Sequence, residues 1–273
     1  MIYKKIPLNS FNDKASNGAF LEIYLHENYF DQALKYRPAM VVVPGGAFFS
    51  IAGKEMETVA LRYLSEGFNC FVISYAINKP YPVPHLDLAV AVLYIKTHEK
   101  EFGLDGHLFQ VGFSAGGYLV GSYSYLYKEL ADTLDINPDV LRPDGIILSY
   151  PVISFVNHPH IVSRKIITGN DESLFEKFSI EKNVTKDYPP TFIWTTSGDT
   201  GVDPENTKVM IDALKNNGVA FDSFIAPNLN HGQSVETIEV RGKFVPFTED
   251  ELICKQWIDK SINFICNNFY KGE

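Results

Sequence analysis

Continuous apolar runs, rich in β-branched and aromatic residues, recur along the chain, and stretches with apolar residues at helical spacing separate them. Such runs are typical of strands that are buried on both faces of a parallel sheet. Residues 19–25 alternate enough between apolar and polar positions to predict an edge strand. The further strands that the pattern predicts are residues 39–43, 69–75, 108–111, 145–149, 190–196 and 220–226.

The intervening amphipathic stretches predict helices. Pro82 and Pro84 predict a connecting loop at residues 81–84 before the second helix. Asp87 falls in the first turn of that helix, where a carboxylate suits the helix dipole, and we expect this structural role rather than a catalytic one. The predicted helical ranges are 54–67, 85–101, 204–217 and a last helix that starts at Thr248 with capping-box spacing.

Buried strands alternate with helices from residue 39 onward, and no linker or internal repeat interrupts them. This alternation predicts the α/β class, with a mostly parallel central sheet and helices on both faces. We expect one domain over residues 1–273. Residues 152–188 carry many polar residues and no strong period, so we expect a small cap or excursion over the strand ends, where a substrate would enter.

The composition supports a large core and narrows the classes of function. Apolar residues make up 45% of the chain, the formal net charge is −9, and no run of Lys or Arg occurs. Because phosphate binding needs a clustered basic face, we expect no nucleic-acid partner and no membrane partner.

The chain shows no apolar region of the signal-peptide kind and no apolar stretch of about 20 residues, which predicts a soluble, cytoplasmic protein. The three cysteines lack metal-ligand spacing, and we expect neither a metal nor a cofactor.

Residues 112–116 read Gly-Phe-Ser-Ala-Gly and lie between a predicted strand and the long apolar run from Tyr118 to Leu126. A Gly-x-Ser-x-Gly sequence in this position is typical of a nucleophile elbow with Ser114 at its apex. The glycines are needed because side chains there would collide with neighbouring backbone. The pattern alone arises by chance in about one chain in ten to fifteen, so its meaning depends on the rest of the chain.

A serine hydroxyl becomes a nucleophile when a base removes its proton, and a carboxylate usually holds that base in one tautomer. In a parallel sheet, catalytic loops follow the carboxyl ends of strands. Among the seven histidines, His231 follows the last predicted strand, whereas the others precede strands, lie beside helices or fall in residues 152–188. His231 is therefore the predicted base.

Two aspartates compete for the acid, because both follow the strand at residues 190–196. Asp203 precedes Pro204 at a predicted helix start, so a capping role explains it without any chemistry. Asp199 follows Gly198 close to the strand end and has no such explanation. We therefore predict Asp199 as the acid.

The strand at residues 39–43 ends in Pro-Gly-Gly-Ala-Phe-Phe. Glycines after a buried strand are consistent either with an anion site made of backbone N–H groups or with an ordinary turn. A serine nucleophile needs an oxyanion hole, and the backbone N–H of Ala115 is one expected donor. The N–H groups of Gly46 and Ala47 are the others, and losing one such donor typically costs about 3 kcal/mol of transition-state stabilisation.

Four features each follow a predicted strand, in this order: the glycine loop, the Gly-x-Ser-x-Gly turn, the aspartate and the histidine. With them the chain resembles the α/β-hydrolase superfamily from about residue 20 to residue 269. More narrowly it resembles the bacterial acetyl-xylan-esterase-like branch, which borders the hormone-sensitive-lipase-like esterases. The residues that carry the narrower resemblance are Pro44-Gly45-Gly46-Ala47, the segment from Glu55 to Ala60, Tyr81-Pro82-x-Pro84-x-Leu86-x-Leu88, Gly112 to Gly117, and Pro204-Glu205-Asn206.

Two departures from the relatives bear on the site. Lipase-like relatives have His-Gly-Gly-Gly, whereas Pro44 and Ala47 replace the first and last of these residues here, and we expect a less adaptable loop that still forms the hole. At Gly201, where relatives commonly carry bulkier apolar residues, we expect a looser acid loop.

The resemblance implies a serine carboxylesterase that acts on a small-molecule ester with a short acyl group, such as an acetyl ester of a sugar or a xylo-oligosaccharide. Phe48, Phe49, Tyr81 and Tyr118 lie near the active loops and either line a substrate pocket or belong to the core. A peptidase-like or formamidase-like hydrolase and a non-catalytic ligand-binding homologue are the alternatives. The sequence leaves open whether the protein forms a homo-oligomer.

Overall fold

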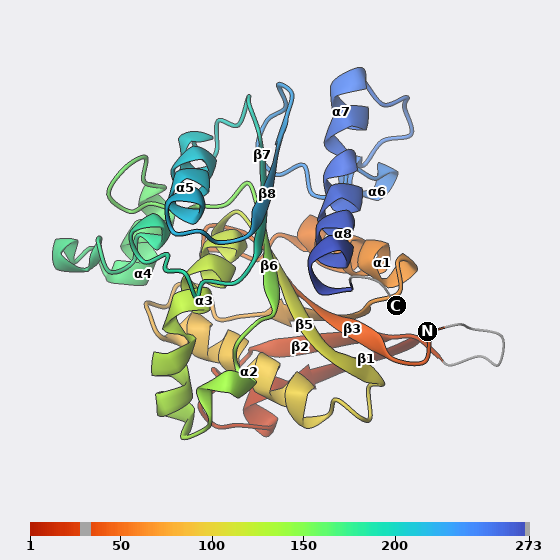
Figure 1. Cartoon of the computed structure of the whole chain (residues 1–273), viewed down its shortest axis with the longest axis vertical. Helices are drawn as coiled ribbons and strands as arrows, with labels where there is room; N and C mark the ends of the chain where they lie inside the picture. Colours follow the sequence, from red (N-terminus) through yellow and green to blue (C-terminus); the bar gives the residue numbers. More distant parts are fainter. Residues whose placement is uncertain (28–33, 271–273) are drawn as a thin grey trace.

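The computed structural model of the protein describes residues 1–27 and 34–270, which form one eight-stranded sheet with helices on both faces (Figure 1). The strand order is β1-β2-β4-β3-β5-β6-β7-β8. The β1–β2 and β2–β4 pairs are antiparallel, and the other neighbours are parallel. The strands are β1 (Ile2–Pro7), β2 (Phe20–Leu25), β3 (Arg37–Val43), β4 (Asn69–Ser74), β5 (Leu104–Phe113), β6 (Gly145–Ser149), β7 (Thr191–Thr196) and β8 (Phe221–Ala226).

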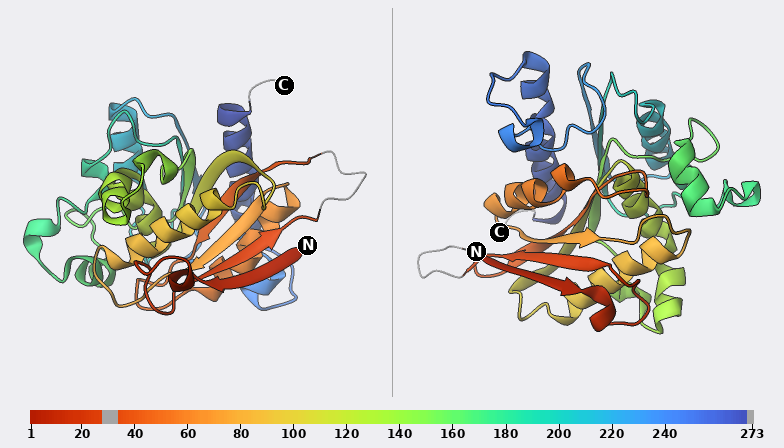
Figure 2. Two further views of the ribbon diagram at one scale, coloured as in Figure 1. Left: turned by 90° about the horizontal axis from the view of Figure 1, so that it is seen from below. Right: turned by 180° about the vertical axis from the view of Figure 1, so that it is seen from behind.

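The helices form a layer on each side of the sheet, as the alternation of elements predicts. Buried residues of α2, α3 and α5 pack on one face, and those of α1, α7 and α8 pack on the other (Figure 1). The sheet is strongly twisted, so that β8 and β1 run in very different directions (Figure 2). The helices are α1 (Glu57–Ser65), α2 (Val83–Thr97), α3 (Ala115–Leu134), α4 (Ile161–Thr168), α5 (Glu205–Asn216), α6 (Ile238–Arg241), α7 (Glu249–Cys254) and α8 (Gln256–Phe269).

The central strand β3 shows why a continuous apolar run forms a central strand. Successive side chains of a strand point to opposite faces, so both faces need apolar residues when helices cover both. Val41 and Val43 pack in the core beneath α2 and α3, whereas Met40 and Val42 pack in the core beneath α1 and α8. The predicted α/β class with a mostly parallel sheet is therefore confirmed.

Three local predictions differ from the structure. The edge strand β1 has no predicted counterpart, because its residues are mostly exposed and carry no buried face. Helix α2 begins at Val83, so the prediction of a loop is wrong for residues 83 and 84. Pro84 is accommodated because the backbone N–H groups of the first helical turn have no intrahelical acceptor. The last predicted helix is two helices, α7 and α8, although the capping box of Thr248 and Glu251 is present.

Asp87 is fully buried in α2 and has a structural role, but it lies beyond the first turn, because the helix begins at Val83 and not at residue 85 as predicted. Its carboxylate accepts hydrogen bonds from the backbone N–H and hydroxyl of Ser16 and from the N–H of Ala76, at 2.8 Å. The carboxylate therefore joins α2 to two loops, and neighbouring donors rather than the helix dipole alone account for its burial.

The segment at residues 152–188 contains α4 and two short 3-10 helices, η4 (Glu172–Leu174) and η5 (Ile180–Lys182). Tyr118 of α3 donates a hydrogen bond to the carbonyl of Phe178, at 2.8 Å, which ties the segment to the main body. In the described part of the chain, no helix is both long and apolar enough to cross a membrane.

Candidate active site

Ser114 stands between the last residue of β5 and the first residue of α3, with a backbone φ of +53°. This left-handed conformation is strained for serine and is typical of a nucleophile at a sharp strand-to-helix turn. A Cβ atom at Gly112 would lie 2.3 Å from the carbonyl oxygen of Gly116, and one at Gly116 would lie 2.2 Å from that of Val43. The turn therefore requires glycine at both positions.

Three side chains from three loops form a continuous line of hydrogen bonds. The hydroxyl of Ser114 lies 2.8 Å from Nε2 of His231. Nδ1 of the same ring lies 2.7 Å from Oδ2 of Asp199. The other carboxylate oxygen of Asp199 accepts the backbone N–H groups of Gly201 and Val202, at 2.8 and 2.9 Å. The three residues predicted from the strand ends are thus brought together.

The hydrogen bonds assign a tautomer to His231. The Asp199 side chain is fully buried, and an ionised carboxylate accepts hydrogen bonds but donates none. Nδ1 of His231 must then carry the proton, which leaves the lone pair of Nε2 directed at the hydroxyl of Ser114. This is the arrangement in which an imidazole removes a proton from a serine.

The competing aspartate, Asp203, lies outside this line. Its Oδ1 accepts the N–H of Glu205 at 3.0 Å, and its Oδ2 lies 2.8 Å from Nδ1 of His158. The hydrogen bond from Glu205, followed by that from His158, lowers the pKa of the Asp203 carboxyl. Helix α5 begins at Glu205, so Pro204 precedes the first helical residue instead of occupying it.

Gly201 does not loosen the acid loop, contrary to the prediction. A Cβ atom there would lie 2.7 Å from Cγ of the His231 ring. The imidazole therefore packs directly on the backbone of Gly201, whose N–H also binds the Asp199 carboxylate. A larger residue at this position would push the imidazole away from its observed place.

The loop after β3 packs against the serine. A Cβ atom at Gly45 would lie 3.0 Å from Cβ of Ser114. Gly46 and Ala47 have φ values of +121° and +58°, so Ala47 adopts a left-handed conformation that is unusual for alanine. Over residues 1–27 and 34–270, the N–H groups of Gly46 and Ala47 donate to no protein acceptor. The N–H of Ala115 opens α3, where intrahelical acceptors are absent.

A cavity of about 680 Å³ opens over the serine. It is bounded by the glycine loop, by the histidine loop and by residues of the 152–188 segment. The lining residues are Gly46, Ala47, Phe49, Ser50, Ala52, Lys54, Glu55, Ser114, His160, Val162, Gly201, His231 and Gly232. Among the described residues, no group of three or more His, Cys, Asp or Glu side chains is arranged to hold a metal ion.

The sequence left open whether four aromatic residues line the pocket or belong to the core, and Phe49 is the one among these four that lines the cavity. Phe48 and Tyr118 are fully buried, with ring centroids 6.0 Å apart, and they belong to the core behind the glycine loop. Tyr81 is half-buried at the start of α2 and does not line the cavity. Phe49 does line it and is 64% exposed at the rim.

His160 lines the cavity. The sequence singled out its segment, residues 152–188, as the place where a substrate would enter, but not this side chain. Its Nδ1 accepts the backbone N–H of Ser163, at 3.3 Å, and lies 2.8 Å from the hydroxyl of that residue. Burial, and then the nearby His231, lower the pKa of His160. A neutral ring with an accepting Nδ1 carries its proton on Nε2, so His160 is a hydrogen-bond donor beside the serine.

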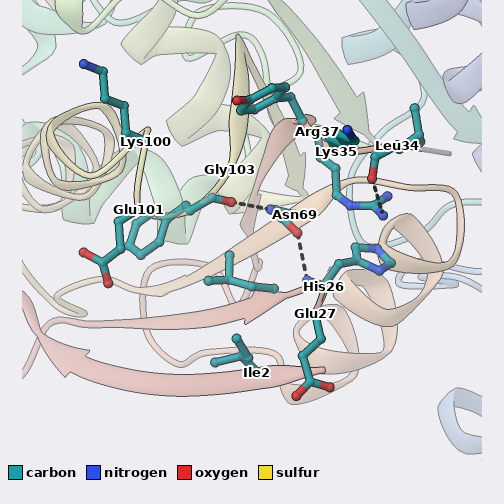
Figure 3. Close-up of a pocket in the computed structure, with 13 residues that line it drawn as sticks. Ile2, His26, Glu27, Leu34, Lys35, Arg37, Asn69, Lys100, Glu101 and Gly103 are labelled. Atoms are coloured by element: carbon teal, nitrogen blue, oxygen red, sulfur yellow. Dashed lines mark hydrogen bonds between the residues drawn. The ribbon is translucent and has the colours of Figure 1, made fainter. Parts of the chain in front are cut away.

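A larger cavity, of about 780 Å³, lies at the other end of the sheet (Figure 3). Its lining includes Arg37 and Asn69, the first residues of β3 and β4, whereas ligands of open α/β sheets bind at the carboxyl ends of the strands. The Asn69 amide accepts the N–H of His26 and donates to the carbonyl of Phe102 (Figure 3). Arg37 donates to the carbonyl of Leu34, at 3.1 Å. These polar groups hold the fold together at the amino ends of the strands.

Comparison with known proteins gives consistent results. A family model described as BD-FAE matches residues 21–214. Endo-1,4-beta-xylanase B of Butyrivibrio fibrisolvens is 34% identical over 243 residues, which is 85% of this chain. The match covers 37% of that xylanase, so this chain spans little more than a third of its length.

Solved structures extend the likeness over nearly all of the chain. The acetyl ester-xyloside bifunctional hydrolase from Caldicellulosiruptor lactoaceticus is 31% identical, with a TM-score of 0.75, and the match covers 96% of this chain and 97% of that one. The carboxylesterase Cest-2923 from Lactobacillus plantarum has a TM-score of 0.83 over 98% of both chains. At 23% identity, the second likeness shows the fold alone.

Proposed function

The chain belongs to the BD-FAE family and has the α/β-hydrolase fold, and on that basis we propose that it is a serine carboxylesterase. The observation that carries the proposal is the line of hydrogen bonds from Asp199 through His231 to Ser114. It lies beside the N–H groups of Gly46 and Ala47, which have no protein acceptor in the described chain. A nucleophile, a base and an anion site in one cavity are the parts that acyl transfer needs.

The first half of the proposed reaction acylates Ser114. The serine oxygen attacks the ester carbonyl carbon, and its proton passes to Nε2 of His231. The carbonyl oxygen becomes an oxyanion that the N–H groups of Gly46, Ala47 and Ala115 stabilise. The intermediate then collapses, the bond to the alcohol oxygen breaks, and the alcohol leaves with the proton from His231.

The second half hydrolyses the acyl-enzyme. Water attacks the acyl carbon and gives one proton to Nε2 of His231. The second tetrahedral intermediate breaks its bond to the Ser114 oxygen, which recovers that proton, and the carboxylic acid departs. Asp199 holds the imidazole orientation and stabilises the imidazolium that forms twice in each cycle.

The proposed substrates are short acyl esters, in particular acetyl esters of sugars or xylo-oligosaccharides. The name of the 31% identical relative, an acetyl ester-xyloside bifunctional hydrolase, supports this choice. The buried rings of Phe48 and Tyr118 pack in the core behind the glycine loop, which favours a short acyl group over a long one. His160 offers a donor to a hydroxyl-rich alcohol, and Phe49 offers an exposed ring at the rim.

Hydrolysis of p-nitrophenyl acetate, butyrate and octanoate by the wild type and by Ser114→Ala tests the proposal. We expect turnover of acetate by the wild type, less with octanoate, and only background hydrolysis with the variant. Wild-type activity no higher than that of Ser114→Ala would refute the esterase assignment. A preference for octanoate over acetate would refute the short-acyl assignment alone.

A further inference from the structure

Glu55 is a buried carboxylate directly beneath the proposed active site, and the mechanism above gives it no role. It ends the short 3-10 helix η2 (Gly53–Glu55) and is 2% exposed. Its Oε2 accepts the backbone N–H of Gly45 at 2.8 Å. Gly45 immediately precedes the two residues whose N–H groups form the proposed oxyanion hole. The carboxylate therefore anchors the glycine loop at its first turn.

The second oxygen of the same carboxylate leads to the histidine loop. Oε1 of Glu55 accepts the hydroxyl of Tyr150 at 2.7 Å. That hydroxyl in turn accepts the N–H of Ser234 at 3.1 Å, three residues after His231. The Tyr150 ring also meets the imidazole of His231 edge to face, with ring centroids 4.9 Å apart. One carboxylate thus connects the loop of the anion site to the loop of the base.

Two further hydrogen bonds hold Ser234 in place. Its hydroxyl donates to the carbonyl of Lys54, the residue before Glu55, at 2.7 Å. Its carbonyl accepts the indole N–H of Trp257 in α8, also at 2.7 Å. The network closes on itself, since it starts and ends in the turn that carries Glu55.

The charge state of Glu55 follows from its partners. Burial raises the pKa of the Glu55 carboxyl, and the hydrogen bonds from Tyr150 and Gly45 oppose that rise. The positive charge that His231 carries when it is protonated, and that of Lys54, also favour the ionised form of Glu55. Burial and Glu55 in turn raise the pKa of the nearby Tyr75 hydroxyl. Both carboxylate oxygens already accept hydrogen bonds, which is the pattern of an ionised group.

We propose that the Glu55 carboxylate is a positioning residue that, through Gly45 and Tyr150, holds the oxyanion loop and the His231 loop in their reactive arrangement. The inference rests on the proposed function, because it assigns Glu55 a role in the same reaction. As an anion near the ring, Glu55 also favours the imidazolium that forms when His231 takes the serine proton. A purely structural carboxylate would affect folding but not these steps.

Glu55→Gln tests the proposal with little change in shape. The amide has a single acceptor oxygen, so one of the two donors, Gly45 or Tyr150, loses its partner. Because a misplacement of about 1 Å can cost on the order of 100-fold in rate, we expect kcat to fall about 10- to 100-fold with KM nearly unchanged. Loss of the anion should also move the low-pH limb of the kcat/KM profile to lower pH by about half a unit.

A matched control separates positioning from general loss of a buried carboxylate. Asp87→Asn removes another buried carboxylate with several hydrogen-bond donors, and none of its partners lines the cavity over Ser114. Once folding is verified by circular dichroism and thermal melting, this variant should keep the wild-type kcat and pH profile. Tyr150→Phe breaks the connection from the other side. Combined with Glu55→Gln, it should add little further loss, since the two residues act as a unit.

Labelling of the serine by a fluorophosphonate distinguishes this inference from the proposed function. A wild type that neither reacts with the probe nor hydrolyses p-nitrophenyl acetate would refute the proposed function, and with it the role of Glu55. A reactive wild type together with folded Glu55→Gln that labels and turns over about ten times more slowly, or worse, supports the inference. Folded Glu55→Gln with kcat within about twofold of the wild type, or with a loss no larger than that of Asp87→Asn, overturns it.

Discussion

Nε2 of His231 lies 2.8 Å from the hydroxyl of Ser114, although 117 positions separate the two residues in the chain. The distance is short enough for direct proton transfer between the two groups. The contact exists because β5 and β8 run parallel within one sheet and end at the same edge.

Asp199→Asn should lower kcat for p-nitrophenyl acetate by about three to four orders of magnitude, because an amide cannot hold the imidazole in the required tautomer. Asp203→Asn should leave kcat within about twofold and stability nearly unchanged, since the amide oxygen can still accept the first N–H of α5. Steady-state kinetics and urea unfolding of both variants measure the two effects. Loss of turnover in a folded Asp203→Asn protein would reassign the acid.

Gly201→Ala should reduce kcat on the order of 100-fold, with a smaller effect on stability. The added methyl group would overlap the His231 ring, whose Cγ would lie 2.7 Å away, and the ring would move off the serine. Gly53→Ala is the matched control, because its Cβ would meet nothing within 4 Å. Equal kcat values for the two variants would show that the imidazole tolerates displacement at this point.

His160→Ala should discriminate between leaving groups. We expect kcat/KM for an acetylated xylo-oligosaccharide to fall about tenfold, because a sugar hydroxyl loses the Nε2–H donor, and a smaller loss with p-nitrophenyl acetate. His160→Gln, which retains an N–H donor, should recover part of the sugar-ester activity. Equal losses on both esters would instead indicate that His160 acts on the triad itself.

The buried Glu236 should make stability depend on pH. Burial, and then the charge of Glu251, raise the pKa of Glu236 to about 7. Since the folded state holds this proton more tightly than the unfolded state, stability should fall as the pH rises from about 4.5 through 7. Glu236→Gln should therefore match the wild type in urea unfolding at pH 5 and exceed it by about 1 to 2 kcal/mol at pH 8.

Glu239→Gln, an exposed neighbour, is the control for the stability prediction. It should follow the wild type at both pH values, because an exposed carboxyl changes its environment little on folding. If Glu236→Gln loses stability with rising pH as steeply as the wild type does, another group causes the dependence.

The parts of the site that follow strands were predictable from the sequence. Ser114, Asp199 and His231 come directly after apolar runs, and the carboxyl ends of parallel strands meet at one edge whatever the details of packing. The choice of Asp199 over Asp203 could also be made from the sequence, because the proline after Asp203 marks a helix start.

The side-chain surroundings of the site were not predictable in the same way. Phe48 and Phe49 are adjacent and chemically identical, yet one is fully buried and the other is 64% exposed. Tertiary packing around a loop with positive φ values determines which of the two rings is buried, and the pattern of apolar residues in the sequence does not indicate it. His160 belongs to a segment without a period. Glu55 falls inside the predicted helix at residues 54–67 and belongs to a segment that carries the resemblance, but its position in that helix predicts no role for its carboxylate.

The bond between Trp257 and Ser234 has a consequence for biosynthesis. During synthesis, the turn with Ser114 and the loop with Gly46 and Ala47 are made well before His231. They are also made before α8, whose Trp257 holds the loop that carries His231. Newly made protein would therefore stay inert toward the proposed ester substrates until α8 has left the ribosome and docked. Hydrolytic activity would then report that α8 has docked.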